Sequence, residues 1–118
     1  MTTASQPGSL FVGVDGGGTG CRARLEDAEG CLLGTGIAGP AALRIGIDRA
    51  LAEVERACRV AIADAGLGSG ALSSVHAAIG LAGIGRKGAL EQLVQRPHPF
   101  RSVVYAHDAT IALSLIHI

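Results

Sequence analysis

Four glycines occur within five residues near the N-terminus, at positions 16, 17, 18 and 20, directly after an aspartate. An apolar run that begins at Leu10 leads into this stretch, and from Cys21 to Leu25 apolar or small side chains alternate with arginines. Alternation with a period of two is typical of a β-strand that buries one face. The segment therefore predicts two antiparallel strands joined by a glycine-rich turn.

A turn of this composition suits phosphate binding. Consecutive glycines let backbone N–H groups approach phosphate oxygens at positions where a Cβ would collide. A plain hairpin turn would explain one or two glycines, but not four after an aspartate. At the end of the first strand, Asp15 can orient a hydrated Mg²⁺, and Thr19 adds a hydroxyl. The candidate nucleotide- and phosphate-binding residues are Asp15, Gly16, Gly17, Gly18 and Thr19, with Asp15 also the candidate metal residue.

Two other glycine motifs fit this stretch less well. A P-loop requires a lysine and a Ser or Thr directly after its glycines, but the chain's one lysine is Lys87. Residues 18–23 match the dinucleotide-binding pattern G-x-G-x-x-A, but that pattern requires a helix to begin there. The alternation that follows favours a hairpin over a βαβ turn.

Length and charge restrict the class of protein. The 118 residues are enough for one domain, or part of one, with a buried core. Ten basic and ten acidic residues cancel, which argues against nucleic acid or an anionic membrane as a partner. No apolar run approaches the roughly 18 residues of a membrane span. Residues 1–9 are expected to be disordered and lack the basic segment of a signal peptide. We expect a cytoplasmic protein.

The cysteines and histidines do not indicate a metal site. Cys21, Cys31 and Cys58 fit no C-x-x-C spacing, and the four histidines have no ligand spacing either. We expect the cysteines to be buried free thiols and the histidines to be packed or on the surface.

The rest of the chain alternates strands with helices. In chain order we predict a third strand over 31–36, an amphipathic helix over 47–65, a loop over 68–74, a buried strand over 75–81, a shorter helix over 86–95 and a last strand over 102–106. Gly66 is expected to end the first helix as its C′ residue, and Pro97 to stop the second. The predicted order is β-β-β-α-β-α-β, with Asp108 just after the last strand.

This order resembles the N-terminal half-domain of the superfamily of actin-like ATPases, sugar kinases and heat-shock ATPases, whose fold is ribonuclease H-like. Within the superfamily the chain is similar to the BadF/BadG/BcrA/BcrD ATPase family, and most of all to its bacterial glucosamine kinase and N-acetylglucosamine kinase members. The resemblance spans about residues 10–112 and is carried by residues 13–19, 21–24, 80–83, 98–100 and 108–109. It implies an α/β actin-like ATPase domain that is truncated before completion.

The resemblance implies phosphoryl transfer from Mg²⁺-ATP to a hydroxyl of an amino sugar, in a cleft between two such domains. Asp15 would then orient the metal through water, and Gly17, Gly18 and Thr19 would contact the phosphates. Asp108 would bind the sugar and act as general base, a role that typically contributes about 10²- to 10⁴-fold. Asp108 can also cap a following helix. The implied partner is a small amino sugar, and the full-length parent could form a homodimer.

The sugar-binding residues implied by the resemblance are Asp108, Ala42 and Gly83. Relatives commonly carry an asparagine in the loop after the third strand, where it hydrogen-bonds the sugar, and here Ala42 takes that position. Loss of one neutral hydrogen bond weakens binding by about 0.5–1.5 kcal/mol. The identity of the sugar is therefore open.

The last six residues form a separate segment. Residues 113–118 correspond to one reading frame of a transposon end used in a common short-read library preparation, so we expect a non-native tail and a gene cut near residue 112. The alternative is a native continuation of a helix over 109–112. The family's second phosphate loop, adenosine-binding segment and second domain have no counterpart in the sequence, so we expect this polypeptide alone to be inactive.

Two other functions stay open at this point. One is an ATPase activator of an iron–sulfur dehydratase, which would need bridging cysteines that the three present do not supply. The other is a non-catalytic module that senses a sugar or nucleotide. Such a regulator usually carries an added DNA-binding segment, for which nine residues before the first strand leave no room.

Overall fold

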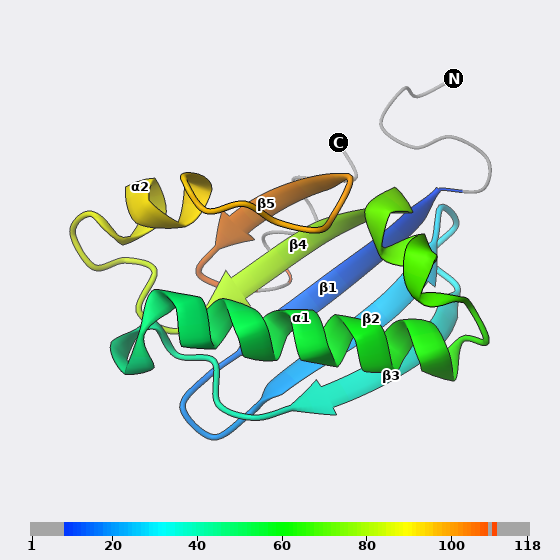
Figure 1. Ribbon diagram of the computed structural model, residues 1–118, viewed down its shortest axis with the longest axis horizontal. Coiled ribbons are helices and arrows are strands. Elements are labelled where there is room, and N and C mark those ends of the chain that lie inside the picture. Colours follow the sequence, from blue (N-terminus) through cyan, green and yellow to red (C-terminus); the bar gives the residue numbers. More distant parts are fainter. Residues whose placement is uncertain (1–8, 109, 111–118) are drawn as a thin grey trace.

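The computed structural model describes residues 9–108 and 110. They form one five-stranded sheet in the order β3-β2-β1-β4-β5 (Figure 1). The strands are β1 (Leu10–Gly16), β2 (Cys21–Asp27), β3 (Leu32–Ala38), β4 (Val75–Leu81) and β5 (Ser102–Ala106). The helices are α1 (Ile47–Asp64) and α2 (Ala89–Val94), with 3₁₀ turns η1 (Leu43–Ile45) and η2 (Ser69–Ser74). The predicted order of strands and helices is confirmed.

The strand directions gather the ends of three strands at one edge of the sheet. β1, β2 and β3 form an antiparallel meander, whereas β4 runs parallel to β1 and β5 runs parallel to β4. Asp15 lies opposite Gly80 in the register, and Gly80 lies opposite Ala106. The carboxyl ends of β1, β4 and β5 therefore meet at the same edge, which is where ligands bind in open α/β sheets.

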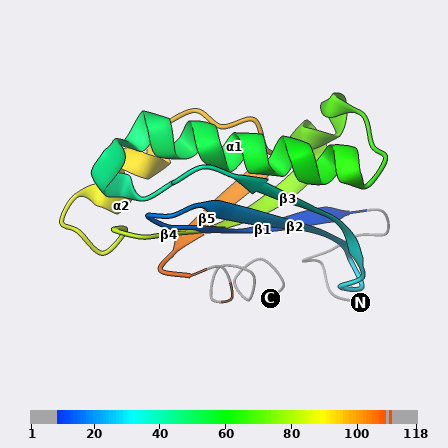
Figure 2. The same cartoon turned by 90° about the horizontal axis from the view of Figure 1, so that it is seen from below.

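Both α-helices cover the same face of the sheet (Figure 2). Val12 and Val14 of β1 join Val54 and Ile62 of α1 in the buried core. Because side chains alternate along a strand, Asp15, the residue after Val14, points to the opposite face and is exposed. On that face Phe11 is buried and stacks on His76, so it is the end with Asp15 that is accessible.

Helix α1 packs on β3 with backbone nearly touching backbone. A Cβ built on Gly36 would lie 2.1 Å from the carbonyl oxygen of Ala57, and one on Gly34 would lie 2.3 Å from that of Ala61. Real Cβ atoms do not approach other atoms so closely, so both glycines are required by packing. The sequence LLGTGIA of β3 is explained by this contact.

The end of α1 matches the sequence, because Gly66 adopts φ +78° as the predicted C′ residue. Its N–H donates to the carbonyl of Ala63, and the N–H of Leu67 donates to that of Ile62, the hydrogen-bond pair of a Schellman motif.

Other predicted boundaries were wrong by a few residues. The third strand covers 32–38, because the N–H of Cys31 instead closes a turn onto the side chain of Asp27 at 3.0 Å. The second helix covers only 89–94, because Gly88, at φ +83°, is its N-cap and turns occupy the preceding residues. The predicted loop over 68–74 contains η2.

The cysteines do not all follow the expectation of buried thiols. Cys21 and Cys58 are buried, but Cys31 is exposed because it lies in the turn between β2 and β3. Burial, helped by the charge of Glu53, raises the pKa of the Cys21 thiol to about 11, and burial raises that of Cys58 further. Both buried thiols are therefore protonated and unreactive at neutral pH.

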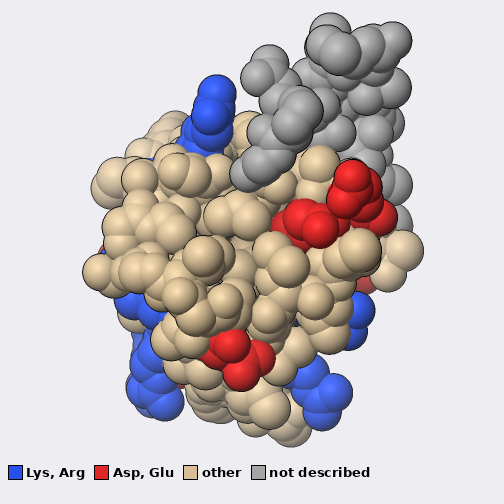
Figure 3. Space-filling view, turned by 90° about the vertical axis from the view of Figure 1, so that its right-hand side faces the viewer, with Lys and Arg blue, Asp and Glu red and all other residues tan. Residues whose placement is uncertain are grey.

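Figure 3 shows one end of the molecule, where scattered basic and acidic side chains lie around a larger uncharged area. In the described part of the chain, no helix is long and apolar enough to cross a membrane. The expectations for the N-terminal residues 1–8 and for the tail over 113–118 concern residues outside the description.

Candidate functional site

The glycine turn between β1 and β2 is closed by its own backbone. The N–H of Gly17 donates to the carbonyl of Gly20 at 2.9 Å. None of the glycines at 16, 17, 18 and 20 has a positive φ, so the turn does not need them for its backbone conformation. The structural reason for a glycine differs from one of these positions to the next.

Gly16 and Gly17 show this difference most clearly. A Cβ on Gly16 would lie 2.7 Å from Cδ2 of Leu81 and 3.0 Å from Cβ of Ala41, so Gly16 is required by packing. Around the corresponding point on Gly17, no described heavy atom outside its chain neighbours lies within 4 Å. Neither packing nor backbone conformation within the described chain accounts for glycine at position 17. The space in front of it is open to a ligand.

Asp15 and Thr19 border a hollow of about 320 Å³ on this side of the turn. Gly17, Gly20 and Arg22 also line it, and Arg22 is the cross-strand neighbour of Asp15. Among the described residues, no group of three or more His, Cys, Asp or Glu side chains could hold a metal ion. A single exposed carboxylate beside a phosphate site does fit Mg²⁺, which keeps most of its waters and takes its remaining ligands from one or two carboxylates and the substrate phosphates.

On the other side of the turn, the structure brings three of the predicted residues together. Gly18, Ala42 and Gly83 line one hollow of about 250 Å³, and its other lining residues are Arg44, Ala82 and Arg86. The chain segments after β1, β3 and β4 thus meet at the edge where the parallel strands end.

Main-chain hydrogen bonds fix these three segments to each other. The N–H of Ala41 donates to the carbonyl of Gly17, that of Ala82 to the carbonyl of Gly16, and that of Leu43 to the carbonyl of Ala82, at 2.9, 2.9 and 3.0 Å. The hollow therefore has a rigid backbone wall that does not depend on which side chain occupies position 42.

Gly83 has a conformational reason to be glycine. Its φ is +96°, which L side chains rarely adopt, and a Cβ there would lie 3.3 Å from Cβ of Leu43. This close approach lets the β4 segment contact the loop after β3. The glycine serves the shape of the hollow whether or not it touches a ligand.

Asp108 reaches the same edge of the sheet but does not line the hollows beside the glycine turn. It lies two residues beyond Ala106, which is opposite Gly80 in the register, and it is exposed. The neighbouring His107 places its ring Cε1 3.0 Å from where a Cβ on Gly85 would be. The predicted base Asp108 thus lies nearer to the turns that follow β4 than to the glycine turn.

The sequence reasoning missed Arg44 and Arg86. Both line the hollow with Gly18, Ala42 and Gly83. Isolated arginines in loops give no periodic signal. Arg44 is two residues after Ala42 and Arg86 is three residues after Gly83, and this nearness to predicted sugar-binding residues is the signal that could have identified them.

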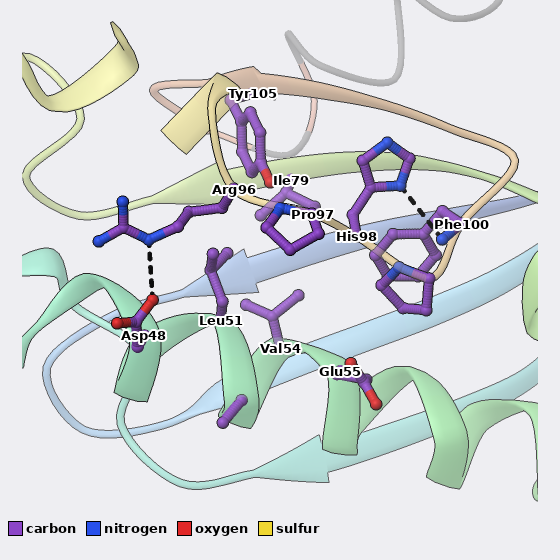
Figure 4. Close-up of a pocket in the computed structure, with 12 residues that line it drawn as sticks. Asp48, Leu51, Val54, Glu55, Ile79, Arg96, Pro97, His98, Phe100 and Tyr105 are labelled. Atoms are coloured by element: carbon purple, nitrogen blue, oxygen red, sulfur yellow. Dashed lines mark hydrogen bonds and ion pairs between the residues drawn. The ribbon is translucent and has the colours of Figure 1, made fainter. Parts of the chain in front are cut away.

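A further cavity lies away from the glycine turn (Figure 4). It measures about 260 Å³ and is formed between α1 and the segment 96–100, with Tyr105 and Ile79 on its sheet side. Arg96 and Asp48 close one end with a 2.8 Å ion pair. Residues 98–100, which carried part of the family resemblance, line this cavity, and Phe100 belongs to the core. None of the predicted site residues is among its lining residues.

The volume of a hollow does not identify the site in this chain. A cavity of about 500 Å³ lies on the sheet face opposite α1, where Asp15 is accompanied by Arg22, Arg24 and Ile37. It shares Asp15, Arg22 and Ile37 with the hollow beside the glycine turn and extends from there along the strands. We place the candidate site at the glycine turn because strand ends, open backbone and charged side chains meet there.

Comparison with known proteins identifies the family. The family model for the BadF/BadG/BcrA/BcrD ATPase family matches residues 12–114. The chain is 37% identical over 101 residues to the glucosamine kinase GspK of Vibrio cholerae serotype O1, a match that covers 86% of the chain and 34% of that protein.

A crystal structure supports the fold. The protein is from Chromobacterium violaceum and is provisionally assigned as an N-acetylglucosamine kinase. It superposes with a TM-score of 0.75 at 30% identity, over 83% of this chain and 34% of that one. The chain therefore spans about a third of the length of the relatives it matches. Sequence and structure together show that it belongs to the BadF/BadG/BcrA/BcrD ATPase family.

Proposed function

We propose that this chain is the N-terminal part of a kinase that transfers a phosphoryl group from ATP to a hydroxyl of an amino sugar, glucosamine or N-acetylglucosamine. The relatives named above support the substrate class. Since the chain spans about a third of their length, the activity belongs to the full-length protein. The fragment alone is expected to have little or none.

The observation that carries the proposal is the open space at Gly17. The residue has no positive φ, and no described heavy atom outside its chain neighbours lies within 4 Å of a Cβ built on it. Gly68 and Gly70 are equally open and also lack a positive φ, but Gly17 differs from them because it lines a hollow together with Asp15 and Thr19. The N–H of Gly17 is used within the turn, so the groups proposed to bind a phosphate oxygen are the N–H groups of Gly18 and Thr19, and a side chain at position 17 would occupy the space beside them.

Asp15, Thr19 and the turn have separate roles in this proposal. Mg²⁺, when bound, would neutralise charge on the phosphates. The carboxylate of Asp15 would hold that ion through its waters, and the hydroxyl of Thr19 would donate a hydrogen bond to a phosphate oxygen. Gly16 holds the turn against Leu81 and so fixes the direction of both groups.

Asp108 is proposed as the general base. The hydroxyl oxygen of the sugar attacks the terminal phosphorus of ATP, the bond from that phosphorus to the bridging oxygen breaks, and ADP leaves. The proton of the hydroxyl passes to the carboxylate of Asp108. The position of Asp108 beyond β5, at the edge shared with the glycine turn, supports this role.

Ala42 bears on which sugar is used. It lines the hollow at the position where the family resemblance implies a sugar-binding asparagine, and an alanine methyl cannot hydrogen-bond a sugar hydroxyl. We therefore propose a weaker hold on that hydroxyl than an asparagine would provide, about 0.5–1.5 kcal/mol less. Such a loss raises the KM for the sugar without removing activity.

The thiols do not support the alternative of an ATPase activator. Cys21 and Cys58 are buried. Cys31 lies in the turn after Asp27, and because Asp27 is opposite Leu10 in the register, this turn is at the far end of the sheet from the glycine turn.

The proposal is tested by ATP binding to the full-length protein and to its Gly17→Val variant. The valine is expected to weaken Mg²⁺-ATP binding at least ten-fold while the melting temperature stays within the error of wild type, because the position is open. The matched control is Gly68→Val, at another open glycine without a positive φ. Wild-type affinity in the Gly17→Val variant would overturn the assignment of this turn to phosphate.

A further inference from the structure

Two arginines stand at the hollow beside the glycine turn. Arg44 comes from η1, after β3, and Arg86 comes from the turns after β4. A Cβ on Gly18 would lie 3.1 Å from Nη2 of Arg44, and one on Gly83 would lie 3.7 Å from Cδ of Arg86. Arg44 therefore lies tightly against Gly18, and Arg86 is in ordinary contact distance of Gly83. A larger residue at position 18 would require the Arg44 guanidinium to shift.

These two arginines lack the partners that most other arginines have. Four arginines of the described chain lie between 2.8 and 3.8 Å from a carboxylate: Arg24, Arg56, Arg59 and Arg96. The guanidinium groups of Arg44 and Arg86 form no hydrogen bond or ion pair with any residue of the described chain. The six residues lining the hollow include no acid. The hollow thus holds two uncompensated positive charges against backbone and small side chains.

Such an arrangement suits an anion with several oxygens. A guanidinium offers a planar fork of N–H donors that matches phosphate oxygens, and charge-assisted hydrogen bonds of this kind are about twice as strong as neutral ones. The glycine turn is directly adjacent, because Gly18 belongs to the turn and also lines the hollow. Ala42, which offers no polar group, leaves the arginines as the polar side chains that face the ligand.

We propose that Arg44 and Arg86 bind the phosphate group that is transferred, either as the terminal phosphate of the nucleotide or as the phosphate on the sugar product. The proposal rests on the proposed function, since it takes the glycine turn as the phosphate site. It adds a pair of side chains from two separate loops, so that the phosphate is held between the backbone of the turn and two guanidinium groups.

The experiment is calorimetric titration of the full-length protein with inorganic tripolyphosphate, and separately with glucosamine 6-phosphate. Arg44→Gln and Arg86→Gln are each expected to weaken binding about ten-fold, and the double variant about 100-fold. Arg44→Lys keeps the charge but loses the planar fork of donors, so its affinity is expected to lie between that of wild type and that of Arg44→Gln. Arg49→Gln, which removes an exposed arginine of α1 away from the hollow, is the control and is expected to bind like wild type.

The two probes separate the two sources of phosphate. Loss of tripolyphosphate binding alone assigns the arginines to the nucleotide, and loss of glucosamine 6-phosphate binding alone assigns them to the sugar. Either result, or both, supports the proposal. Circular dichroism of each variant checks that the fold is retained, and binding that weakens only together with loss of the helix signal would count against a direct contact.

Further outcomes separate this inference from the function on which it rests. If the wild-type protein binds tripolyphosphate, loses it in Gly17→Val, and keeps it in the double arginine variant, the arginine proposal is overturned and the phosphate turn stands. If the arginine variants lose binding while Gly17→Val does not, the proposal for the arginines is supported and the assignment of the glycine turn to phosphate is wrong. No binding by the wild-type protein to either probe would overturn both.

Discussion

The N–H of Ala41 donates a hydrogen bond to the carbonyl oxygen of Gly17, with nitrogen and oxygen 2.9 Å apart. This single bond joins the glycine turn after β1 to the loop after β3, which come from separate parts of the hairpin meander. Because the link is made by main chain, the loop keeps its place when its side chains change. The main-chain wall of the hollow is therefore set independently of the side chain at position 42.

The close packing of α1 on β3 gives a direct test of the fold. Gly36→Ala places a methyl group 2.1 Å from the carbonyl oxygen of Ala57, so strand and helix must move apart. We expect a loss of about 1–3 kcal/mol or more in the free energy of unfolding, measured by urea denaturation. Gly70→Ala is the control, because no described heavy atom beyond its chain neighbours lies within 4 Å of its Cβ position. Equal stability of the two variants would contradict the described packing.

His76 gives the fold a dependence on pH. Its Nδ1 lies 2.6 Å from Oγ of Ser102 and its ring stacks on Phe11, and burial, with the charge of Arg101 second, lowers its pKa below 6.5. The folded pKa is below the unfolded one, so the contribution to stability is complete above about pH 6.5 and is lost as the pH falls through the folded pKa.

We therefore expect His76→Asn to flatten the fall in unfolding free energy between pH 7.5 and pH 5, measured by urea denaturation at each pH. Arg101→Gln is expected to flatten it less, because burial is the larger cause of the shift. An unchanged pH profile in His76→Asn would contradict this account.

The thiols are expected to react in a fixed order. Cys31 is exposed, whereas Cys21 and Cys58 are buried with raised pKa values. At pH 7.5 a thiol reagent should label one cysteine of the native chain and all three in urea, as counted by mass spectrometry. The Cys31→Ser variant should not be labelled in its native state. Native labelling of Cys58 would show that α1 does not cover β2 as described.

The sequence was sufficient for the order of elements because each carries its own local pattern. The hairpin follows from alternation around the glycines, and the end of α1 from Gly66, whose positive φ only glycine adopts readily. The start of α2 was missed because Gly88 interrupts a stretch that otherwise has helical spacing. What could not be predicted is spatial: Arg44, after β3, and Arg86, after β4, line one hollow with Gly18 because main-chain hydrogen bonds join these loops to the glycine turn and to each other.

Asp108 is tested in the full-length protein. Asp108→Asn is expected to lower kcat by about two to four decades, because a base is removed. ATP binding should persist, since the phosphate turn is untouched. Steady-state kinetics and nucleotide titration on the same preparation separate the two effects. A variant that keeps wild-type kcat would remove Asp108 from the reaction.

Position 42 is expected to affect the sugar rather than the rate. Ala42→Asn adds a hydrogen-bonding group at the hollow, so we expect the KM for the amino sugar to fall with little change in kcat. Thermal melting checks that the larger side chain is accommodated. A change in kcat with unchanged KM would mean that this residue does not face the sugar.

The central claim is amino-sugar kinase activity at the glycine turn. Its most direct measurement is phosphate transfer from labelled ATP to glucosamine, N-acetylglucosamine and glucose, offered separately to the full-length protein and to its Asp15→Asn variant. We expect one or both amino sugars to be phosphorylated in preference to glucose, with much lower turnover in the variant. If no sugar is phosphorylated, and ATP is hydrolysed only when a reductase partner is added, the kinase account is wrong and the activator function replaces it.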